Sequence, residues 1–425
     1  MAEVEVPDYF LCPISMQMMR DPVTTSSGIT YDRENIEKWL IKFKNTTCPV
    51  TKQELLTIDL TPNHTLRRLI QSWCIMNSSH GVEPIPTPKP QVTKIHVLKL
   101  LKEAKKSQEM QLSCLRKLRS IAYSSESNKK CLESVGVIDF LASIIKKKDV
   151  LAFVEDSKHV SSDIVSPKIL HTPLEFTKAG DVALDILFHL NLSNEDLKKS
   201  ILRDEFFLDS LLHFLKYGNY QSRAYAITLL KSAFNVADPG FLIGVKQEYF
   251  KEILFVLKTK ISQQATKAAL KLLVELCPWG RNRIKAIEVG AVSTLIELLL
   301  DTNERRSCEL ILAILHQLCS CAEGRAELSS HGAGVAIVSK KILRVSQMAS
   351  ERAVRILSSI SKFSANSRVL QEMLQVGVVS KLCLVLQVDS CSKTKDRVKE
   401  ILRLHSRVWR DSSCIPPYLL SSYPS

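Results

Sequence analysis

The spacing of apolar positions along the chain predicts a protein that is almost wholly helical. In residues 33–43 and 64–74, apolar side chains recur at i, i+3, i+4 and i+7, which places them on one face of a helix. Beyond residue 94 the same period returns in one segment after another, with Leu, Ile, Val and Ala at most apolar positions. Aromatic residues make up only 6% of the chain, which favours helix packing over a sheet sandwich.

The apolar segments beyond residue 94 also form a weak internal repeat. Four of them follow a glycine, which we expect to end one helix as a C-cap and free the chain to begin the next: Gly136, Gly290, Gly332 and Gly377. The last three glycines are 42 and 45 residues apart, and another long helical segment precedes each apolar one. A unit of about forty residues is typical of armadillo and HEAT repeats, whose helices stack into a solenoid with a concave binding groove.

Composition places the boundaries between these regions. Four prolines at positions 84, 86, 88 and 90 remove amide donors and fix φ, which predicts a spacer over residues 77–93. Residues 6–76 then form a small N-terminal module, and residues 94–411 form the repeats. Residues 147–180 are polar and weakly periodic, so we expect an irregular insertion there. Residues 412–425 are expected to be a tail.

The positive charge is confined to one part of the chain. The net charge is +14, yet residues 1–76 hold eight Lys and Arg against nine Asp and Glu. The excess therefore belongs to the repeats, where it predicts an acidic partner or simply solvates the outer helix faces. No aromatic residues are interleaved with it as in single-strand binders, so nucleic acid is not expected, whereas contact with a membrane surface stays open.

The remaining composition points to a cytoplasmic or nuclear protein. The first residues lack a secretion signal, and no apolar run is long enough to span a bilayer. In that setting the twelve cysteines are expected to be reduced. Phosphate-binding loops, dinucleotide fingerprints and nucleophile elbows do not occur.

One stretch, residues 12–51, has the spacing of a zinc-binding RING domain without its ligands. The eight ligand positions hold Cys12, Ser15, Ser27, Ile29, Asp32, Asn35, Cys48 and Thr51. Structural zinc needs four nitrogen or sulfur ligands at each site, so neither a metal nor any other cofactor is predicted. The short polar side chains at these positions can instead hold the loops by hydrogen bonds to the backbone.

These motifs resemble a known domain. The segments "FLCPIS", "DPV", "GITYDRENIEKWL", "CPVTKQ" and "LTPNHTLRRLIQSW" occur in the order typical of a U-box, the zinc-free relative of the RING. With the spacer and repeats, the whole chain is similar to plant U-box/armadillo ubiquitin ligases, most closely to the subgroup linked to immune and stress signalling. The resemblance implies a mainly α chain, in which a small α+β U-box precedes an all-α armadillo-type superhelical solenoid.

The resemblance also implies a mechanism and its residues. A U-box binds a ubiquitin-conjugating enzyme that carries ubiquitin and positions it for a substrate lysine, without a covalent intermediate of its own. By position, Pro13, Ile14, Trp39 and Pro49 would bind the conjugating enzyme. Lys52 stands where related ligases carry a cationic linchpin, although a solvated loop lysine is the equal alternative. Trp39 could instead be purely a core residue.

The other residues of the pattern are expected to support the module. Cys12 and Cys48 would be buried, while Asp21, Asp32 and Asn63 would close turns, cap helices and pin loops, with Asp32 as the N-cap of the first helix. The groove of the repeats would hold the substrates, and the resemblance suggests dimerisation. The alternative function is a non-catalytic adaptor with a degenerate U-box. A transport receptor for basic peptides needs an acidic groove, against which the charge argues.

Overall fold

The computed structural model describes residues 5–85, 92–145, 179–190, 192–197, 205–389 and 391–410, together with residues 415 and 423. Most of the expected insertion at 147–180, part of the spacer and most of the tail lie outside these residues. The prediction is wrong for positions 179 and 180, which begin helix α7 (Ala179–His189). The chain divides into two compact units, residues 1–147 with 159–191 and residues 148–158 with 192–425.

The first unit begins with a small module built on a three-stranded antiparallel sheet. The strands β1 (Pro22–Thr24), β2 (Thr30–Asp32) and β3 (Thr61–Pro62) pair in the order β2-β1-β3, with Val23 of the central strand opposite Tyr31. The short helix α1 (Arg33–Glu37) follows β2 directly. Val23 and Tyr31 are fully buried, so the sheet is one wall of the module's core.

Two helices complete this core. The chain continues from α1 into η2 (Lys38–Lys42), one turn of π-helix, and helix α2 (His64–Met76) follows β3. The wider π turn ends the expected apolar stripe early, and Phe43 is 64% exposed. Ile36 and Leu40 remain buried beside Ile70 of α2. Short 3-10 turns flank the module at Asp8–Phe10 (η1) and Ser78–His80 (η3).

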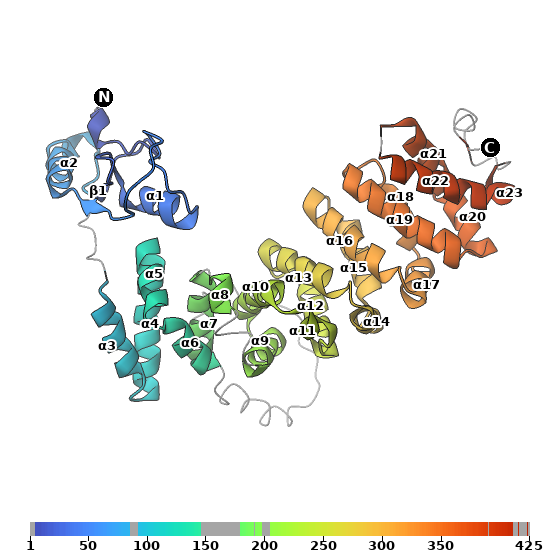
Figure 1. Ribbon diagram of the computed structural model, residues 1–425, viewed down its shortest axis with the longest axis horizontal. Helices are drawn as coiled ribbons and strands as arrows, with labels where there is room; N and C mark the ends of the chain where they lie inside the picture. Colours follow the sequence, from blue (N-terminus) through green and yellow to red (C-terminus); the bar gives the residue numbers. More distant parts are fainter. Residues whose placement is uncertain are drawn as a thin grey trace. The chain divides into compact units, whose positions relative to one another are not determined.

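The described part of the first unit also contains five helices beyond the module: α3 (Lys94–Ala104), α4 (Gln108–Ser124), α5 (Glu126–Ser134), α6 (Val137–Ile145) and α7. Helix α5 packs against α1 and η2 of the module. The α4 helix packs against α3 and α7 (Figure 1). The module is thus in contact with the first helical repeat.

The second unit consists of stacked helices throughout its described residues. They are α8 (Asn194–Asp196), α9 (Glu205–Tyr217), α10 (Tyr220–Val236), α11 (Pro239–Ile243), α12 (Gln247–Thr259), α13 (Gln263–Leu276), α14 (Gly280–Glu288), α15 (Ala291–Asp301), α16 (Arg305–Leu318), α17 (Ala322–Ser330), α18 (Gly334–Lys341), α19 (Gln347–Phe363), α20 (Ser367–Gln375), α21 (Val378–Gln387), α22 (Ser392–Leu404) and α23 (Ser406–Trp409). None of the single described helices is long and apolar enough to span a membrane, although α20 and α21 together, bent by 62°, would be.

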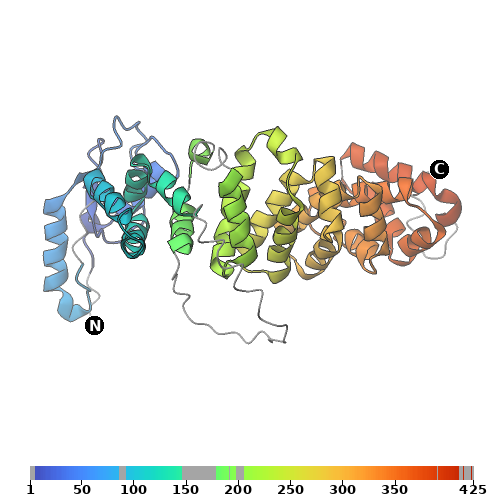
Figure 2. The same cartoon turned by 90° about the horizontal axis from the view of Figure 1, so that it is seen from below.

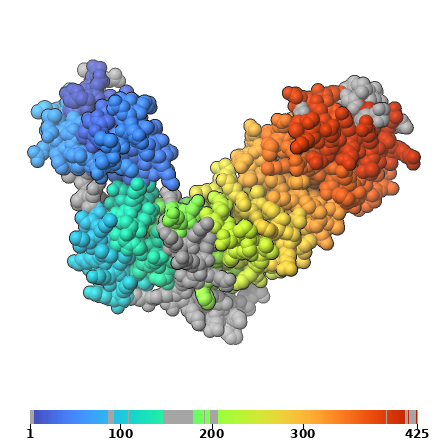
Figure 3. All heavy atoms as spheres, viewed as in Figure 1, coloured from blue at the N-terminus to red at the C-terminus, as the bar shows by residue number. Residues whose placement is uncertain are grey.

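Five long helices of the second unit pack against one another in succession. We call α10, α13, α16, α19 and α22 the ladder helices, because each contacts its neighbour in this order (Figures 1 and 2). Side chains link them at the contacts: Gln317 of α16 donates to the Val274 carbonyl of α13, and Ser359 of α19 donates to the Cys319 carbonyl. Seen as spheres, the helices from α12 to α22 form one continuous body (Figure 3).

Three of the four repeat glycines take the expected role. Gly136, Gly290 and Gly377 have φ of 76°, 83° and 72°, a left-handed conformation that costs other residues energy. Gly332 lies outside this region, so the prediction for it is wrong. The residue required in that repeat is Gly334, where a Cβ atom would collide with the Leu328 carbonyl oxygen of α17.

Candidate functional site

Two loops of the N-terminal module have the same backbone conformation. In "CPISMQ" the Cys12 amide donates to the Gln17 carbonyl and the Met16 amide to the Cys12 carbonyl, both at 2.8 Å. In "CPVTKQ" the amides of Cys48 and Lys52 make the equivalent bonds at 2.8 and 2.9 Å. The fifth residue of each loop has positive φ, 54° at Met16 and 59° at Lys52. The two segments are therefore structural counterparts, position by position.

Hydrogen bonds hold the first loop at the positions that carry zinc ligands in a RING. The sulfur of Cys12 accepts from the Asp32 amide at 3.3 Å and from the Asn35 side chain at 3.7 Å. The same Asn35 nitrogen donates to the Ser15 hydroxyl at 3.0 Å. These four residues occupy the first, second, fifth and sixth of the eight ligand positions, which in a RING would bind one zinc ion. They fix the loop to the start of helix α1.

The second loop is held in the same way around Cys48. Its sulfur accepts from the Ser27 hydroxyl at 3.2 Å and from the Thr51 amide at 3.5 Å, and it lies 3.0 Å from the Tyr31 hydroxyl. Burial acts to raise the pKa of Cys48, but the bonds from Ser27, Thr51 and Tyr31 outweigh burial and lower this pKa to about 6. Burial and the bond to Cys48 raise the pKa of Tyr31, so its phenol is the donor.

The loop tips present apolar side chains to solvent. Ile14 is 36% exposed in the first loop, and its counterpart in the second is Val50, 50% exposed. Residue Pro49, which the sequence favoured, corresponds to Pro13 and is half-buried. Val50 was missed because a valine after "CP" carries no signal by itself; alignment of the loops with one another would have found it. Exposed branched side chains on two rigid loops are suited to anchor a partner.

Trp39 of η2 lies beside the second loop. Its indole nitrogen donates to the Thr47 carbonyl at 2.7 Å, and the side chain is half-buried. It packs against the module's core while part of the ring stays accessible. The ammonium of Lys52 lies 5.9 Å from the centre of this ring, within the range of a cation–π contact. Lys52 itself is exposed, so its charge stands at the edge of the loop surface.

Of the three supporting polar residues, one caps a helix and the other two hold loops in place. Asn63 caps α2, since its side-chain oxygen accepts from the Leu66 amide at 3.0 Å. Asp21 pairs with Arg33 at 2.6 Å. Asp32 precedes α1, but its carboxylate accepts from the amides of Arg20 and Asp21 and makes no cap bond. The predicted capping role of Asp32 is therefore wrong: the carboxylate closes the turn before β1.

Glu37 connects the module to the repeats and was not predicted. This α1 carboxylate is 2% exposed and accepts from the Ser127 amide of α5 at 3.4 Å. Arg33 lies 3.8 Å away and is shared with Asp21. Burial raises the pKa of Glu37, against the Ser127 bond and the Arg33 charge, which lower it. Glu37 is separate from the exposed tips of the two loops, which carry Ile14 and Val50.

Comparison with known proteins agrees with both parts of the chain. Residues 6–79 match the family of the U-box domain, and residues 96–425 match that of the plant U-box protein ARM repeat region. The chain is 50% identical to E3 ubiquitin-protein ligase PUB22 of Arabidopsis thaliana, over 100% of this chain and 99% of the relative. It is 49% identical to E3 ubiquitin-protein ligase PUB23 of the same plant, over 99% and 98%.

The fold also resembles a solved structure. A structure from work on the interaction between cadherin and beta-catenin aligns with a TM-score of 0.53 over 80% of this chain and 58% of that chain, at 12% identity. This likeness supports the armadillo architecture of the repeats. With the family matches and the full-length relatives, it shows that the chain belongs to the plant U-box/armadillo family and is an E3 ubiquitin-protein ligase of the U-box type.

Proposed function

We propose that the two loops and Trp39 bind a ubiquitin-charged conjugating enzyme, and that the repeats hold the substrate whose lysine receives ubiquitin. The observation that carries this proposal is the pair of loops with the same backbone conformation, which present Ile14 and Val50, together with the partly accessible Trp39. Pro13 and Pro49 shape the two tips. In a protein–protein interface, a few central side chains typically supply most of the binding free energy.

The chemistry belongs to the bound enzyme, and the U-box supplies position. Cys12 and Cys48 are fully buried and accept hydrogen bonds, so neither forms a thioester with ubiquitin. Holding the thioester near a substrate lysine turns an encounter in solution into a reaction within one complex. In this proposal the exposed charge of Lys52 contacts ubiquitin or the conjugating enzyme and restricts the thioester's motion. Lysine offers a point charge for this role, where arginine would offer a planar fork.

A reconstituted reaction tests the proposal. It combines activating enzyme, a panel of conjugating enzymes, ubiquitin and ATP with the intact protein, Ile14→Ala or Leu56→Ala. Loss of the Ile14 anchor should reduce chain formation at least about tenfold, because a central anchor contributes roughly 1–2 kcal/mol or more to docking. Leu56 is 93% exposed in the same module and is the matched control, expected to retain activity.

The outcomes distinguish a ligase that docks its conjugating enzyme through the two loops from a non-catalytic adaptor. Full activity of Ile14→Ala, with thermal unfolding unchanged, would place the docking surface elsewhere. If the intact folded protein built no chains with any conjugating enzyme, the adaptor function would replace the ligase mechanism proposed here. A loss confined to Ile14→Ala supports docking through the loops.

The wider setting is also part of the proposal. The resemblance supports a role in plant defence and stress signalling, a cytoplasmic location with access to the nucleus, and a homodimer. Altered defence responses in plants that lack the gene, the position of a fluorescent fusion, and light scattering of the purified chain test these three points in turn. Normal responses, a secreted fusion or a monomer at working concentration would each remove the corresponding point.

A further inference from the structure

A cavity of about 330 Å³ lies among helix ends of the second unit. It is lined by residues from the turn before α19, the end of α21 and the first turn of α22. Aliphatic side chains form part of the lining: Val385 is buried, whereas Leu343 and Val388 are exposed at the rim. The volume falls at the lower end of the range for small-ligand sites, about 300–1,000 Å³.

The lining also contains a buried hydroxyl, that of Thr394. This residue is 4% exposed and begins the buried stripe of α22, which continues with Val398 and Ile401. Val398 and Ile401 belong to the packed core, whereas Thr394 borders the cavity. Its hydroxyl has no hydrogen-bond partner among the described residues. A buried polar group of this kind costs stability until a ligand or water satisfies it.

The start of α16 shows which group suits such a hydroxyl. Glu304 is the N-cap there, and its carboxylate accepts from the Arg306 amide at 3.3 Å and from the amide and hydroxyl of Ser307 at 2.8 and 2.5 Å. The hydroxyl bond is the largest influence on the pKa of Glu304, which is lowered although burial acts to raise it. Ser307 is the third residue of its helix, so this helix start stabilises a carboxylate.

Helix α22 repeats this arrangement without its carboxylate. Cys391 is the N-cap and makes no side-chain cap bond, and Thr394 is the third residue of the helix. The Thr394 amide bonds to the Cys391 carbonyl at 2.9 Å. The amide of Lys393 and the hydroxyl of Thr394 have no acceptor within the part of the chain that the structure describes. A carboxylate supplied from outside would make the bonds that Glu304 makes in α16.

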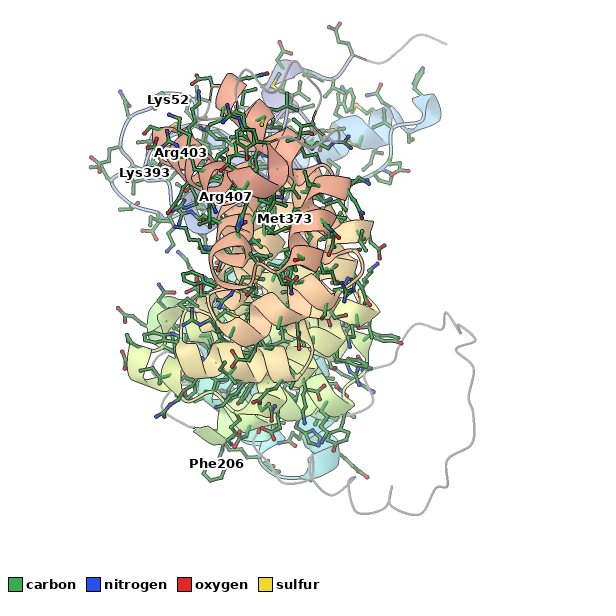
Figure 4. All side chains as sticks on the ribbon, turned by 90° about the vertical axis from the view of Figure 1, so that its right-hand side faces the viewer. Lys52, Phe206, Met373, Lys393, Arg403 and Arg407 are labelled. Atoms are coloured by element: carbon green, nitrogen blue, oxygen red, sulfur yellow. The ribbon has the colours of Figure 1, made fainter. Side chains whose placement is uncertain are left out.

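Cations surround the same cavity. Arg344 lines it, is exposed, and forms no ion pair with any described residue. Burial lowers the pKa of Lys381, and the charges of Arg344 and Lys340 lower it further, so these three cations lie near one another. Lys393 lies on α22 at the C-terminal end of the unit (Figure 4). The N-terminal ends of α19 and α22 add the positive ends of two helix dipoles.

We propose that this cavity binds the C-terminal residue of a partner polypeptide, through its free carboxylate and a branched aliphatic side chain. The carboxylate accepts from the Thr394 hydroxyl and the Lys393 amide and pairs with Arg344. The side chain of the bound residue contacts Val385 and Val388. This inference rests on the proposed function, because it names the part of a substrate that the repeats hold.

The lining favours a chain end over other anions. A phosphate group carries about two negative charges and would be opposed by Asp389, an exposed acid of the lining. A carboxylate carries one, and the amide before it can donate to Asp389. A small free carboxylate would leave the exposed rim at Leu343 and Val388 uncovered, whereas a polypeptide continues across it.

Fluorescence anisotropy of the full-length protein tests the inference. The probes are fluorescein-labelled peptides of about eight residues, Gly and Ser followed by Val, Leu or Ile with a free C-terminal carboxylate. Each is paired with the same peptide as a C-terminal amide. At least one free acid should bind at least about tenfold more tightly than its amide, because the amide removes the charge. Equal binding of acid and amide, or binding of none of the three acids, would overturn the inference.

Substitutions locate the binding. Arg344→Gln and Thr394→Val remove the cation and the hydroxyl, and each should weaken binding at least about fivefold. The matched controls are Arg281→Gln, which removes an exposed arginine of α14, and Thr394→Ser, which keeps the hydroxyl. Both should stay within about twofold. An equal loss in Arg281→Gln would show that net charge alone attracts the peptide, and would overturn the inference.

A further variant supplies the carboxylate from the chain itself. Cys391→Glu gives α22 the kind of N-cap that α16 has, so it should raise the Tm and abolish peptide binding. Cys391→Gln has nearly the same size without the charge and should bind within about threefold of the intact protein. A Cys391→Glu protein with raised Tm that still binds the peptide fully would contradict the proposed position of the carboxylate.

Two other comparisons complete the test. Tighter binding of a phosphoserine peptide, or of N-acetyl-leucine, than of the best free-acid peptide would overturn the inference in favour of that ligand. The substitutions leave the module untouched, so every variant should build ubiquitin chains as the intact protein does. An intact protein that builds chains but binds no peptide contradicts only the cavity. One that binds the peptide but builds no chains contradicts the ligase mechanism proposed for the loops.

Discussion

Two buried sulfur atoms organise the docking module at the scale of single residues. Cys12 and Cys48 are fully buried, and each accepts hydrogen bonds from side chains and amides that stand at the ligand positions of a metal-binding relative. A hydrogen-bonded centre depends on the protonation of its members, whereas a metal centre depends on the metal. The module's stability should therefore respond to pH through Cys48.

The pH response of Cys48 has a definite sign. Its pKa is about 6 in the folded protein, against an ordinary value near 9, so its stabilising contribution is fully present above pH 9 and is lost as pH falls through 6. Between these limits the free energy of unfolding of the module should rise by roughly 2–4 kcal/mol. Hydrogen exchange of residues 22–62, corrected for its intrinsic pH dependence, measures this change.

Substitution identifies the group responsible. Cys48→Ser keeps a hydrogen-bonding atom that does not ionise in this range, so the variant should lose the pH dependence. Cys74→Ser is the control, because burial raises the pKa of Cys74 and its substitution should leave the rise between pH 6 and 9 in place. A wild-type module with flat stability over this range would show that Cys48 stays a thiol.

Residue types in the sequence predicted the contents of the site better than the bond each residue makes. Ile14 and Trp39 follow from the resemblance of their motifs to a U-box, and Asn63 follows from its position at the start of a helical segment. The partners of Asp32 do not, because an aspartate before a helix can accept either from its own first turn or from a neighbouring loop. Loop geometry makes Val50 the counterpart of Ile14, and it depends on the positive φ of Met16 and Lys52, neither of which is a glycine.

At the scale of elements, the contact of α1 with α5 depends on one buried carboxylate. Glu37 accepts from the Ser127 amide, and its burial raises its pKa above the ordinary value of 4.5. The charged form therefore costs stability, and this cost appears as pH rises through the raised pKa. The variant Glu37→Gln keeps an acceptor for Ser127 and removes the charge. Arg33 keeps its shorter pair with Asp21.

We expect Glu37→Gln to stabilise the contact by about 1 kcal/mol at neutral pH and to lose this advantage as pH falls below the raised pKa of Glu37, where the wild-type carboxyl is itself protonated. Hydrogen exchange of α5 at both pH values measures the change. The control Glu34→Gln alters an exposed carboxylate of the same helix and should leave α5 unchanged. Weaker protection of α5 in Glu37→Gln at neutral pH would show that the charge itself holds the contact.

Helix boundaries show where sequence patterns lose information about elements. The period of apolar residues identified the ladder helices, because burial along a whole helix leaves a repeated signal. The π turn at Lys38–Lys42 left no such signal, and Phe43 was therefore assigned to the buried face. Gly332 and Gly334 are both glycines of one short connection. Only the approach of the Leu328 carbonyl distinguishes the one that is required.

At the scale of the whole molecule, the roles proposed for the two parts of the chain depend on different forces. The two loops of the module are apolar at Ile14 and Val50, whereas the ladder helices hold fourteen Lys and Arg against five Asp and Glu. Apolar burial is little affected by moderate salt, but the Debye length falls from about 10 Å at 0.1 M to about 3 Å at 1 M. Salt should therefore separate the two activities in one protein.

The prediction is that salt inhibits transfer to an acidic substrate more than chain formation by the ligase itself. Raising sodium chloride from about 0.05 to 0.3 M should slow transfer to a carrier protein fused to a peptide rich in Glu and Asp at least about fivefold more than self-modification in the same tube. A variant that carries Lys231→Gln, Lys271→Gln and Arg397→Gln in the ladder helices should transfer slowly from the start and show little further loss. Parallel inhibition of both reactions would mean that the step they share, binding of the conjugating enzyme, depends on charge, and it would contradict the different forces assigned to the loops and the ladder helices.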